Sequence, residues 1–279
     1  MSQKKDVSKD KTFLIDLTRC TGCRACQVAC KQWNQMKAEK TTFFQGEGYS
    51  NPPAMSENTL TRIKFRDYEK HGENEFAFYK EMCMHCNEPA CASVCPVSAL
   101  VKTEEGPVIY NPTRCIGCRF CMIACPFGIP KYQWSKALPL VVKCTGCYSR
   151  IKEGLKPACA HACPSAISYG NRTEMINEAQ KRLSSSPDKY INRIYGLDEA
   201  GGTSVLYLSP LSFDELGFKD ITKRPLPSLT WAALRLVPIV FLTMGSTLTF
   251  VSWLTHRKDR LRREEKARKL AQTQQKEKD

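Results

Sequence analysis

The sequence of 279 residues lacks several features by which common classes of protein are recognised. Its first eleven residues are polar and charged, without the apolar run of a secretory signal peptide, which by itself indicates a cytoplasmic protein. No Cys-x-x-Cys-His occurs, which excludes covalent attachment of c-type haem. We find no acid–base pair, nucleophile constellation or phosphate-binding glycine loop. The chain is therefore expected not to be catalytic itself.

Histidine is also scarce, with four residues in the chain. A Rieske centre replaces two cysteines by two histidines, and His85 and His161, which lie inside cysteine motifs, are better explained as packing or hydrogen-bonding residues. The formal net charge is +14, yet the sequence has neither a helix-turn-helix nor a basic face with aromatic platforms. We therefore expect no nucleic-acid partner.

Cysteine, in contrast, is abundant, and its 16 residues fall into four groups of four. One group reads Cys115-Ile-Gly-Cys118-Arg-Phe-Cys121-Met-Ile-Ala-Cys125-Pro126, which is the spacing of a bacterial ferredoxin loop. Three closely spaced thiolates bind three irons of one cluster, and the fourth cysteine ligates a second cluster. Motifs 1 to 4 are, in order, Cys20, Cys23, Cys26 and Cys30; Cys83, Cys86, Cys91 and Cys95; Cys115, Cys118, Cys121 and Cys125; and Cys144, Cys147, Cys159 and Cys163.

Sixteen thiols in four quartets predict four 4Fe-4S clusters with no ligand left over. Zinc sites use two Cys-x-x-Cys pairs separated by a long spacer, a pattern that only motif 4 approaches. A disulfide framework is disfavoured because cysteines only two residues apart are poorly placed for bridges. Basic residues beside the motifs are expected to offset the charge of the clusters; they are Arg24, Lys31, Arg119 and Lys143.

The four motifs form an internal repeat. Residues 18–24 match residues 113–119, and residues 88–91 match residues 156–159, so the motifs alternate between two kinds. A two-cluster module needs one motif of each kind to exchange fourth cysteines. Spacing leaves two partitions open, neighbouring pairs or a nested arrangement with motifs 2 and 3 inside motifs 1 and 4. The gaps of 19 residues after Cys95 and 18 residues after Cys125 do not decide between them.

The flanking sequence predicts an α+β fold of two ferredoxin-like modules, followed by one C-terminal transmembrane helix. Strands are expected at 12–17, 107–112 and 205–208, a hairpin from 60–68 and 75–80, and a helix at 173–183. The expected divisions are a polar N-terminus (1–11), a cluster domain (12–225), a transmembrane helix (226–255) and a basic tail (256–279).

Residues 236–254 form a run of 19 residues without a charge. As a helix this run is about 28 Å long, close to the bilayer core of roughly 30 Å. The basic residues that follow Leu254 predict a cytoplasmic C-terminus, with the cluster domain on the other face of the inner membrane. Our hypothesis is that a partner with an export signal carries the folded domain across. No histidine lies in this run to hold a haem, so if electrons enter the bilayer, another subunit must carry them there.

Taken together, these residues resemble the iron-sulfur β subunit of membrane-bound formate dehydrogenases. The resemblance covers residues 12–254, and the long basic tail departs from it. It is carried by the four quartets, Ala29-Cys-Lys-Gln-Trp-Asn34, Cys83-Met-His-Cys86, Cys125-Pro-Phe-Gly-Ile-Pro130, residues 170–175, Gly201-Gly-Thr203 and the single C-terminal helix.

The resemblance implies an electron-transfer subunit with the nested partition. The implied ligand sets are Cys20, Cys23, Cys26 and Cys163; Cys144, Cys147, Cys159 and Cys30; Cys83, Cys86, Cys91 and Cys125; and Cys115, Cys118, Cys121 and Cys95. The outer module, built from motifs 1 and 4, is then expected to face a molybdopterin catalytic subunit that oxidises formate. The inner module, built from motifs 2 and 3, is expected to face a membrane cytochrome b and the quinone pool. An equivalent subunit of a hydrogenase or another molybdopterin oxidoreductase is the alternative.

Overall fold

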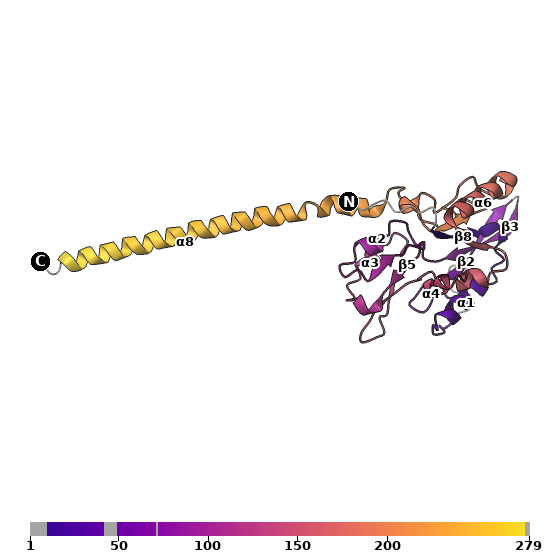
Figure 1. The fold of residues 1–279 in the computed structure, drawn as a ribbon, viewed down its shortest axis with the longest axis horizontal. Coiled ribbons are helices and arrows are strands. Elements are labelled where there is room, and N and C mark those ends of the chain that lie inside the picture. The colour runs from indigo at the N-terminus through magenta and orange to yellow at the C-terminus, as the bar shows by residue number, and fades with distance from the viewer. Residues whose placement is uncertain (1–9, 42–48, 71, 277–279) are drawn as a thin grey trace. The chain divides into compact units, whose positions relative to one another are not determined.

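The computed structural model describes residues 10–41, 49–70 and 72–276. It divides into two units, residues 1–227 and residues 228–279. Most of the expected polar N-terminus (1–9) and the end of the expected basic tail (277–279) lie outside the described residues. The first unit combines short strands with short helices (Figure 1), which confirms the predicted α+β fold class.

A three-stranded sheet joins the two ends of the first unit. Its strands, in spatial order, are β8 (Ile167–Asn171), β1 (Lys11–Asp16) and β9 (Val205–Leu208). Strand β1 is antiparallel to β8 and parallel to β9. Helix α6 (Arg172–Ser185) follows β8 directly and begins at a capping box made by Asn171 and Glu174. Because β1 precedes motif 1 and β8 follows motif 4, this pairing holds the first and last motifs close together.

The two faces of this sheet have different partners because side chains alternate along each strand. Leu14 and Leu206 pack with Ala179 of α6 on one face. Phe13 and Ile15 point the other way and belong to the main core, which also contains cysteines of motifs 1, 2 and 4. The sheet therefore separates α6 from the cysteine-rich core.

The remaining strands of the first unit form separate hairpin-like pairs, and its remaining helices have nine residues or fewer. Three two-stranded sheets pair β2 (Arg62–Lys70) with β3 (Glu73–Glu81), β4 (Leu100–Lys102) with β5 (Val108–Tyr110), and β6 (Lys131–Tyr132) with β7 (Val141–Val142). The α-helices are α1 (Ala25–Trp33), α2 (Ala90–Ser93), α3 (Phe120–Ala124), α4 (Tyr148–Lys152) and α5 (Ala158–His161). The 3-10 helices are η1 (Leu17–Arg19), η2 (Pro112–Arg114), η3 (Pro187–Lys189) and η4 (Glu199–Gly201). These elements, with β1, α6 and β9, confirm the predicted strands, hairpin and helix.

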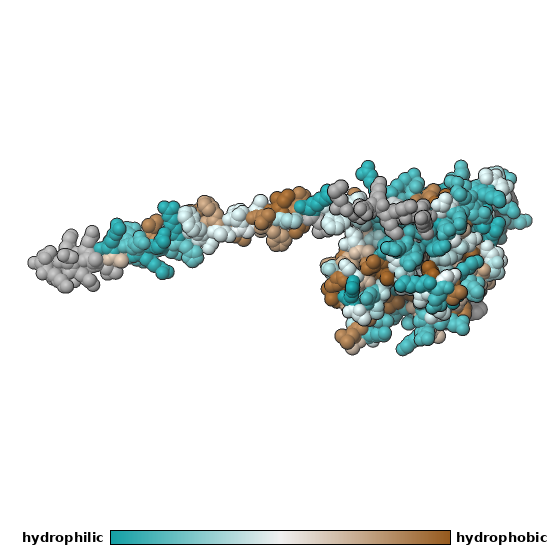
Figure 2. All heavy atoms as spheres, viewed as in Figure 1, coloured by the Kyte–Doolittle hydropathy of each residue, from teal (hydrophilic) through white to brown (hydrophobic). Residues whose placement is uncertain are grey.

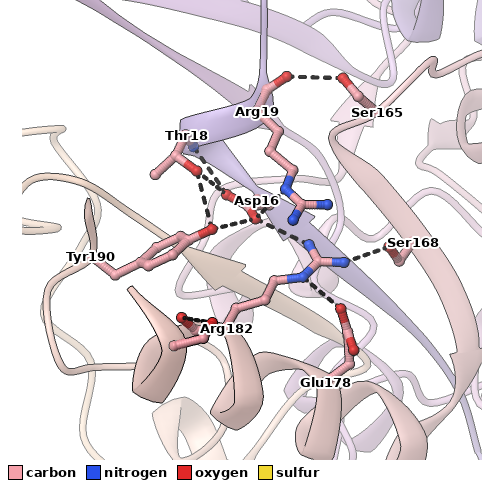
Figure 3. Close-up of polar contacts among 9 residues, drawn as sticks. Asp16, Thr18, Arg19, Ser165, Ser168, Glu178, Arg182 and Tyr190 are labelled. Carbon is pink, nitrogen blue, oxygen red and sulfur yellow. Dashed lines mark hydrogen bonds and ion pairs between the residues drawn. The ribbon is translucent and has the colours of Figure 1, made fainter. Parts of the chain in front are cut away.

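Strand β1 ends in a buried acidic network that positions motif 1 (Figure 3). The carboxylate of Asp16 is fully buried and accepts hydrogen bonds from the backbone N–H and the hydroxyl of Thr18, at 3.1 and 2.6 Å. Arg182 of α6 donates to the same carboxylate at 3.0 Å and Tyr190 donates at 2.9 Å. Asp16 therefore caps η1, which leads into Cys20, and ties it to α6.

The repeat supplies a matched test of this network, because Asn111 caps η2 before motif 3 through Thr113 alone. Replacing Asp16 by alanine leaves Arg182 without its buried partner, and we expect a loss of about 3 kcal/mol. The Asn111→Ala variant loses only an exposed cap, worth about 1 kcal/mol. Thermal bleaching of the visible iron-sulfur absorption should therefore begin roughly 10 °C lower in Asp16→Ala, and about 3 °C lower in Asn111→Ala. Equal shifts of the bleaching temperature in the two variants would show that the buried Asp16–Arg182 pair adds no stability beyond that of the cap.

The C-terminal unit is helical. Helix α7 (Leu226–Leu234) and helix α8 (Val237–Lys276) are separated at Arg235 and Leu236. Pro238 explains the break because it has no N–H to donate to the carbonyl of Leu234. Residues 237–269 of α8 are long and apolar enough to cross a membrane. Figure 2 shows hydrophobic side chains along the first part of α8 and hydrophilic ones along the second, within one continuous helix.

Candidate metal-cluster sites

Motifs 1 and 4 meet where α1 packs against α5. Two hollows lie at this contact, and each is lined by four cysteines. The first holds Cys20, Cys23, Cys26 and Cys163. The second holds Cys30, Cys144, Cys147 and Cys159. The last cysteine of each motif thus lies with the first three cysteines of the other.

Motifs 2 and 3 meet in the same way where α2 packs against α3, and these helices lie side by side in Figure 1. One hollow at this contact is lined by Cys95, Cys115, Cys118 and Cys121. The remaining four thiols are close enough for their charges to interact: burial raises the pKa of Cys86, and the thiolates of Cys83, Cys125 and Cys91 raise it further. In each of the three hollows, the first three cysteines of one motif therefore lie with the last cysteine of another.

The loops that carry these cysteines have a shared backbone geometry. The residue before the second cysteine has a positive φ in every motif, +67° at Gly22, +48° at His85, +71° at Gly117 and +68° at Gly146. This conformation turns two of the glycine N–H groups toward the first sulfur of their motifs, at 3.4 Å for Gly117 and 3.3 Å for Gly146. Such N–H···S bonds stabilise negative charge on a ligating sulfur.

Burial raises the pKa values of the gathered thiols. The pKa of Cys20 rises to about 11 and that of Cys30 to about 12, first because the groups are buried and then because neighbouring thiolates repel a further negative charge. The same two causes raise the pKa of Cys121 to about 11. Iron bound to these cysteines would remove this penalty, because a metal ion ligates the thiolate form directly. The clusters of thiols thus suit a strongly cationic metal core.

The spacing of the thiols suits a metal group with volume of its own. In the part of the chain that the structure describes, no three His, Cys, Asp or Glu side chains converge closely enough to hold a single metal ion. A structural zinc needs four ligands at about 2.0–2.3 Å from one centre. Four cysteines that line a hollow instead match the thiolate ligation of a 4Fe-4S cubane. The residues present therefore fit this cofactor.

Lys80 of β3 is a buried cation that the sequence analysis missed. It is 1% exposed, lines both hollows at the contact of motifs 1 and 4, and donates to the hydroxyl of Thr61. Burial alone would lower its pKa, but the thiolates of Cys159, Cys26 and Cys30 outweigh this effect and raise the pKa. A lysine in a strand ordinarily points to solvent, so only the folded hairpin reveals this position.

The basic residues predicted to offset cluster charge have different environments. Only Lys143 is buried, and its ammonium group donates to the carbonyls of Val108 and Cys144. The other three occupy more exposed positions and contact other groups: Arg24 lies over Phe65, Arg119 over Tyr132 and Trp134, and Lys31 pairs with Glu39. Among the four, Lys143 alone is thus both buried and adjacent to a ligand candidate.

Comparison with known protein families supports the same chemistry. Residues 74–172 match the family model of a 4Fe-4S dicluster domain, and residues 11–32 match that of a 4Fe-4S binding domain. The first range contains the cysteines of motifs 2 to 4, and the second contains those of motif 1.

Three relatives illustrate the extent of the similarity. A protein of Nitratidesulfovibrio vulgaris is 37% identical over 262 residues, which cover 93% of this chain and 70% of the relative. The iron-sulfur subunit of the nitrate-inducible formate dehydrogenase of Escherichia coli K12 is 36% identical over 211 residues, 74% of this chain and 70% of the relative. The hydrogenase-2 operon protein HybA of Escherichia coli O157:H7 is 36% identical over 240 residues, 73% of this chain and 71% of the relative.

Proposed function

Because the chain belongs to the family of iron-sulfur subunits of formate dehydrogenases, we propose that it is the electron-transfer subunit of such a complex. It relays electrons from a molybdopterin catalytic subunit, which oxidises formate, to a membrane cytochrome b and the quinone pool. The observation that carries this proposal is the gathering of sixteen thiols into four groups. Two groups combine cysteines of motifs 1 and 4, and two combine cysteines of motifs 2 and 3. The chain itself performs no substrate chemistry.

Each group of thiols holds one 4Fe-4S cluster in this proposal. The ligands are Cys20, Cys23, Cys26 and Cys163; Cys30, Cys144, Cys147 and Cys159; Cys83, Cys86, Cys91 and Cys125; and Cys95, Cys115, Cys118 and Cys121. A bound cluster supplies one-electron reduction and oxidation. The protein supplies the ligands, N–H···S bonds and an interior from which apolar side chains exclude water.

The contacts between groups support a linear order. The first two groups share motifs 1 and 4 and flank Lys80. Cys144 of the second group is close enough to Cys83 of the third for their charges to interact. Cys91 of the third group has the same relation to Cys121 of the fourth. Electrons therefore have a path from the outer module to the inner one.

Metal analysis of the isolated complex tests the proposal. Four cubanes require about 16 irons and about 16 sulfides per chain, with electron paramagnetic resonance signals that appear on reduction. Stoichiometric zinc, or an iron-free chain, would contradict it. The substrate oxidised by the same complex separates formate dehydrogenase from the alternative, a hydrogenase, which the similarity to HybA makes the second candidate.

The apolar helix supports a single-pass location in the inner membrane. Residues 237–254 carry the apolar stretch, and basic residues follow from Arg257 onward. By the positive-inside rule the C-terminus is cytoplasmic and the cluster domain lies on the periplasmic face. Protease added to outside-facing spheroplasts should therefore cleave the cluster domain. A cluster domain that is cleaved only after the membrane is opened would reverse this orientation.

Lys80 should raise the reduction potentials of both clusters in the outer module, because a buried cation stabilises the more negative, reduced state. The Lys80→Met variant is expected to lower both potentials by on the order of 100 mV, as measured by redox titration of the paramagnetic signals. Lys64 on the partner strand provides the control, because its ammonium group lies over the ring of Tyr79 and lines neither hollow. Equal shifts in Lys80→Met and Lys64→Met would refute the assignment.

A further inference from the structure

Motif 2 departs from the other three at one backbone position. Where motifs 1, 3 and 4 have Gly22, Gly117 and Gly146, motif 2 has His85, and all four residues adopt a positive φ. A side chain in this left-handed region costs about 1 kcal/mol or more, and glycine avoids the cost. The imidazole of His85 thus occupies a position at which the fold itself favours glycine, so its side chain is the feature that needs an explanation.

The ring of His85 is buried, with 1% of the residue exposed, and both nitrogens have partners. Its Nδ1 lies 3.0 Å from the backbone N of Val108. A backbone N–H can only donate, so Nδ1 accepts and carries no proton. The proton of the neutral ring is therefore on Nε2, which lies 3.5 Å from Sγ of Cys144.

The groups around the ring favour this neutral tautomer. The ring is buried near the ammonium groups of Lys143 and Lys102, and it is neutral because Nδ1 accepts from the Val108 N–H. Lys102 donates to the backbone carbonyl of His85 at 3.0 Å, which helps to fix the loop. The ring also lies against the motif 4 loop, because a Cβ atom built on Gly146 would be 3.5 Å from Nε2. Position, tautomer and direction of the N–H are therefore all determined by the surrounding chain.

We propose that His85 sets the reduction potential of the second cluster of the outer module by donating an N–H···S hydrogen bond to Cys144. This inference rests on the proposed cluster ligation. His85 lies between Cys83 and Cys86 of the third group, so one short loop ligates one cluster and hydrogen-bonds a ligand of its neighbour in the other module. A hydrogen bond to a ligating sulfur stabilises the reduced, more negative cluster and so raises its potential. His85 acts through Cys144 and is a positioning residue at the junction of the two modules.

The His85→Gly variant tests this role without introducing backbone strain, since it installs the residue that the other motifs have. In the complete complex we expect an unchanged iron content and a roughly tenfold shift of one cluster toward its oxidised form, which is about 59 mV for one electron. The other three potentials should stay constant. Electron-nuclear double resonance of the reduced cluster should also lose one exchangeable proton.

Two further variants make the result decisive. The His85→Asn side chain tolerates a positive φ but is too short to reach Cys144, so it should reproduce the shift of His85→Gly. His161 of motif 4 is an exposed histidine, and His161→Ala should leave all four potentials unchanged. Unchanged potentials in fully loaded His85→Gly, or loss of clusters in both His85 variants, would overturn the proposal. A parent complex without iron would instead overturn the proposed function.

Discussion

The Cys125→Ser variant is expected to lose the cluster of motif 2, although Cys125 belongs to motif 3. Its sulfur lies with those of Cys83, Cys86 and Cys91 and accepts backbone N–H groups from the loop that follows it. Serine is a poor ligand for iron in this setting, so we expect the cluster to be lost or to lose one iron and become a three-iron cluster. Complete loss lowers the iron content by about four atoms, a quarter of the expected total.

The neighbouring Cys121 provides the matched control, because it is only four residues away in the same motif. Cys121→Ser should remove the cluster formed with Cys95, Cys115 and Cys118. Cys125→Ser and Cys86→Ser should therefore lose the same paramagnetic signal. Cys121→Ser and Cys118→Ser should both lose a second, different signal. If Cys125→Ser and Cys121→Ser lose the same signal, the fourth cysteines are not exchanged between motifs.

The existence of the four quartets was predictable from sequence because ligand spacing within a motif is local. The pairing of one motif with another could not be predicted in this way. It depends on β1 pairing with β8, in which Lys11 lies opposite Asn171, and no pattern near either strand specifies so distant a partner. The similar lengths of the linkers after motifs 2 and 3 left both partitions geometrically possible. Only the resemblance to a family favoured nesting before the fold was known.

Lys80 and His85, two buried polar side chains near the proposed cluster sites, could not be assigned a role from the sequence either, for different reasons. Lys80 has no distinguishing neighbour in the sequence, and its role depends on the face of the β2–β3 hairpin that turns inward. His85 did leave a signal, since it replaces the glycine found at the equivalent position of the other motifs. That signal showed that the position is unusual, but its partner, Cys144, lies 59 residues away and becomes visible only in the fold.

The second large effect is the loss of membrane attachment that we expect when α8 is removed. A chain that ends at Pro227 should leave the membrane fraction almost completely, with its clusters retained, because residues 1–227 form a unit separate from residues 228–279. Within its own unit, the apolar stretch of α8 has exposed side chains, for example 74% at Phe241 and 65% at Leu248. We expect the transfer of this surface into lipid to anchor the chain. Alkaline carbonate extraction, which strips proteins attached only through partners, measures the difference.

A chain that ends at Thr255 is the matched control, because it keeps the apolar stretch and removes the basic continuation of α8. It should resist carbonate extraction as the full chain does, because lipid burial of residues 237–254 is unchanged. Its orientation, however, should become mixed, since the charges that favour a cytoplasmic C-terminus are gone. Carbonate-resistant attachment of the chain ending at Pro227 would show that α8 is not the anchor. Loss of its iron would show that the cluster unit depends on the helical one.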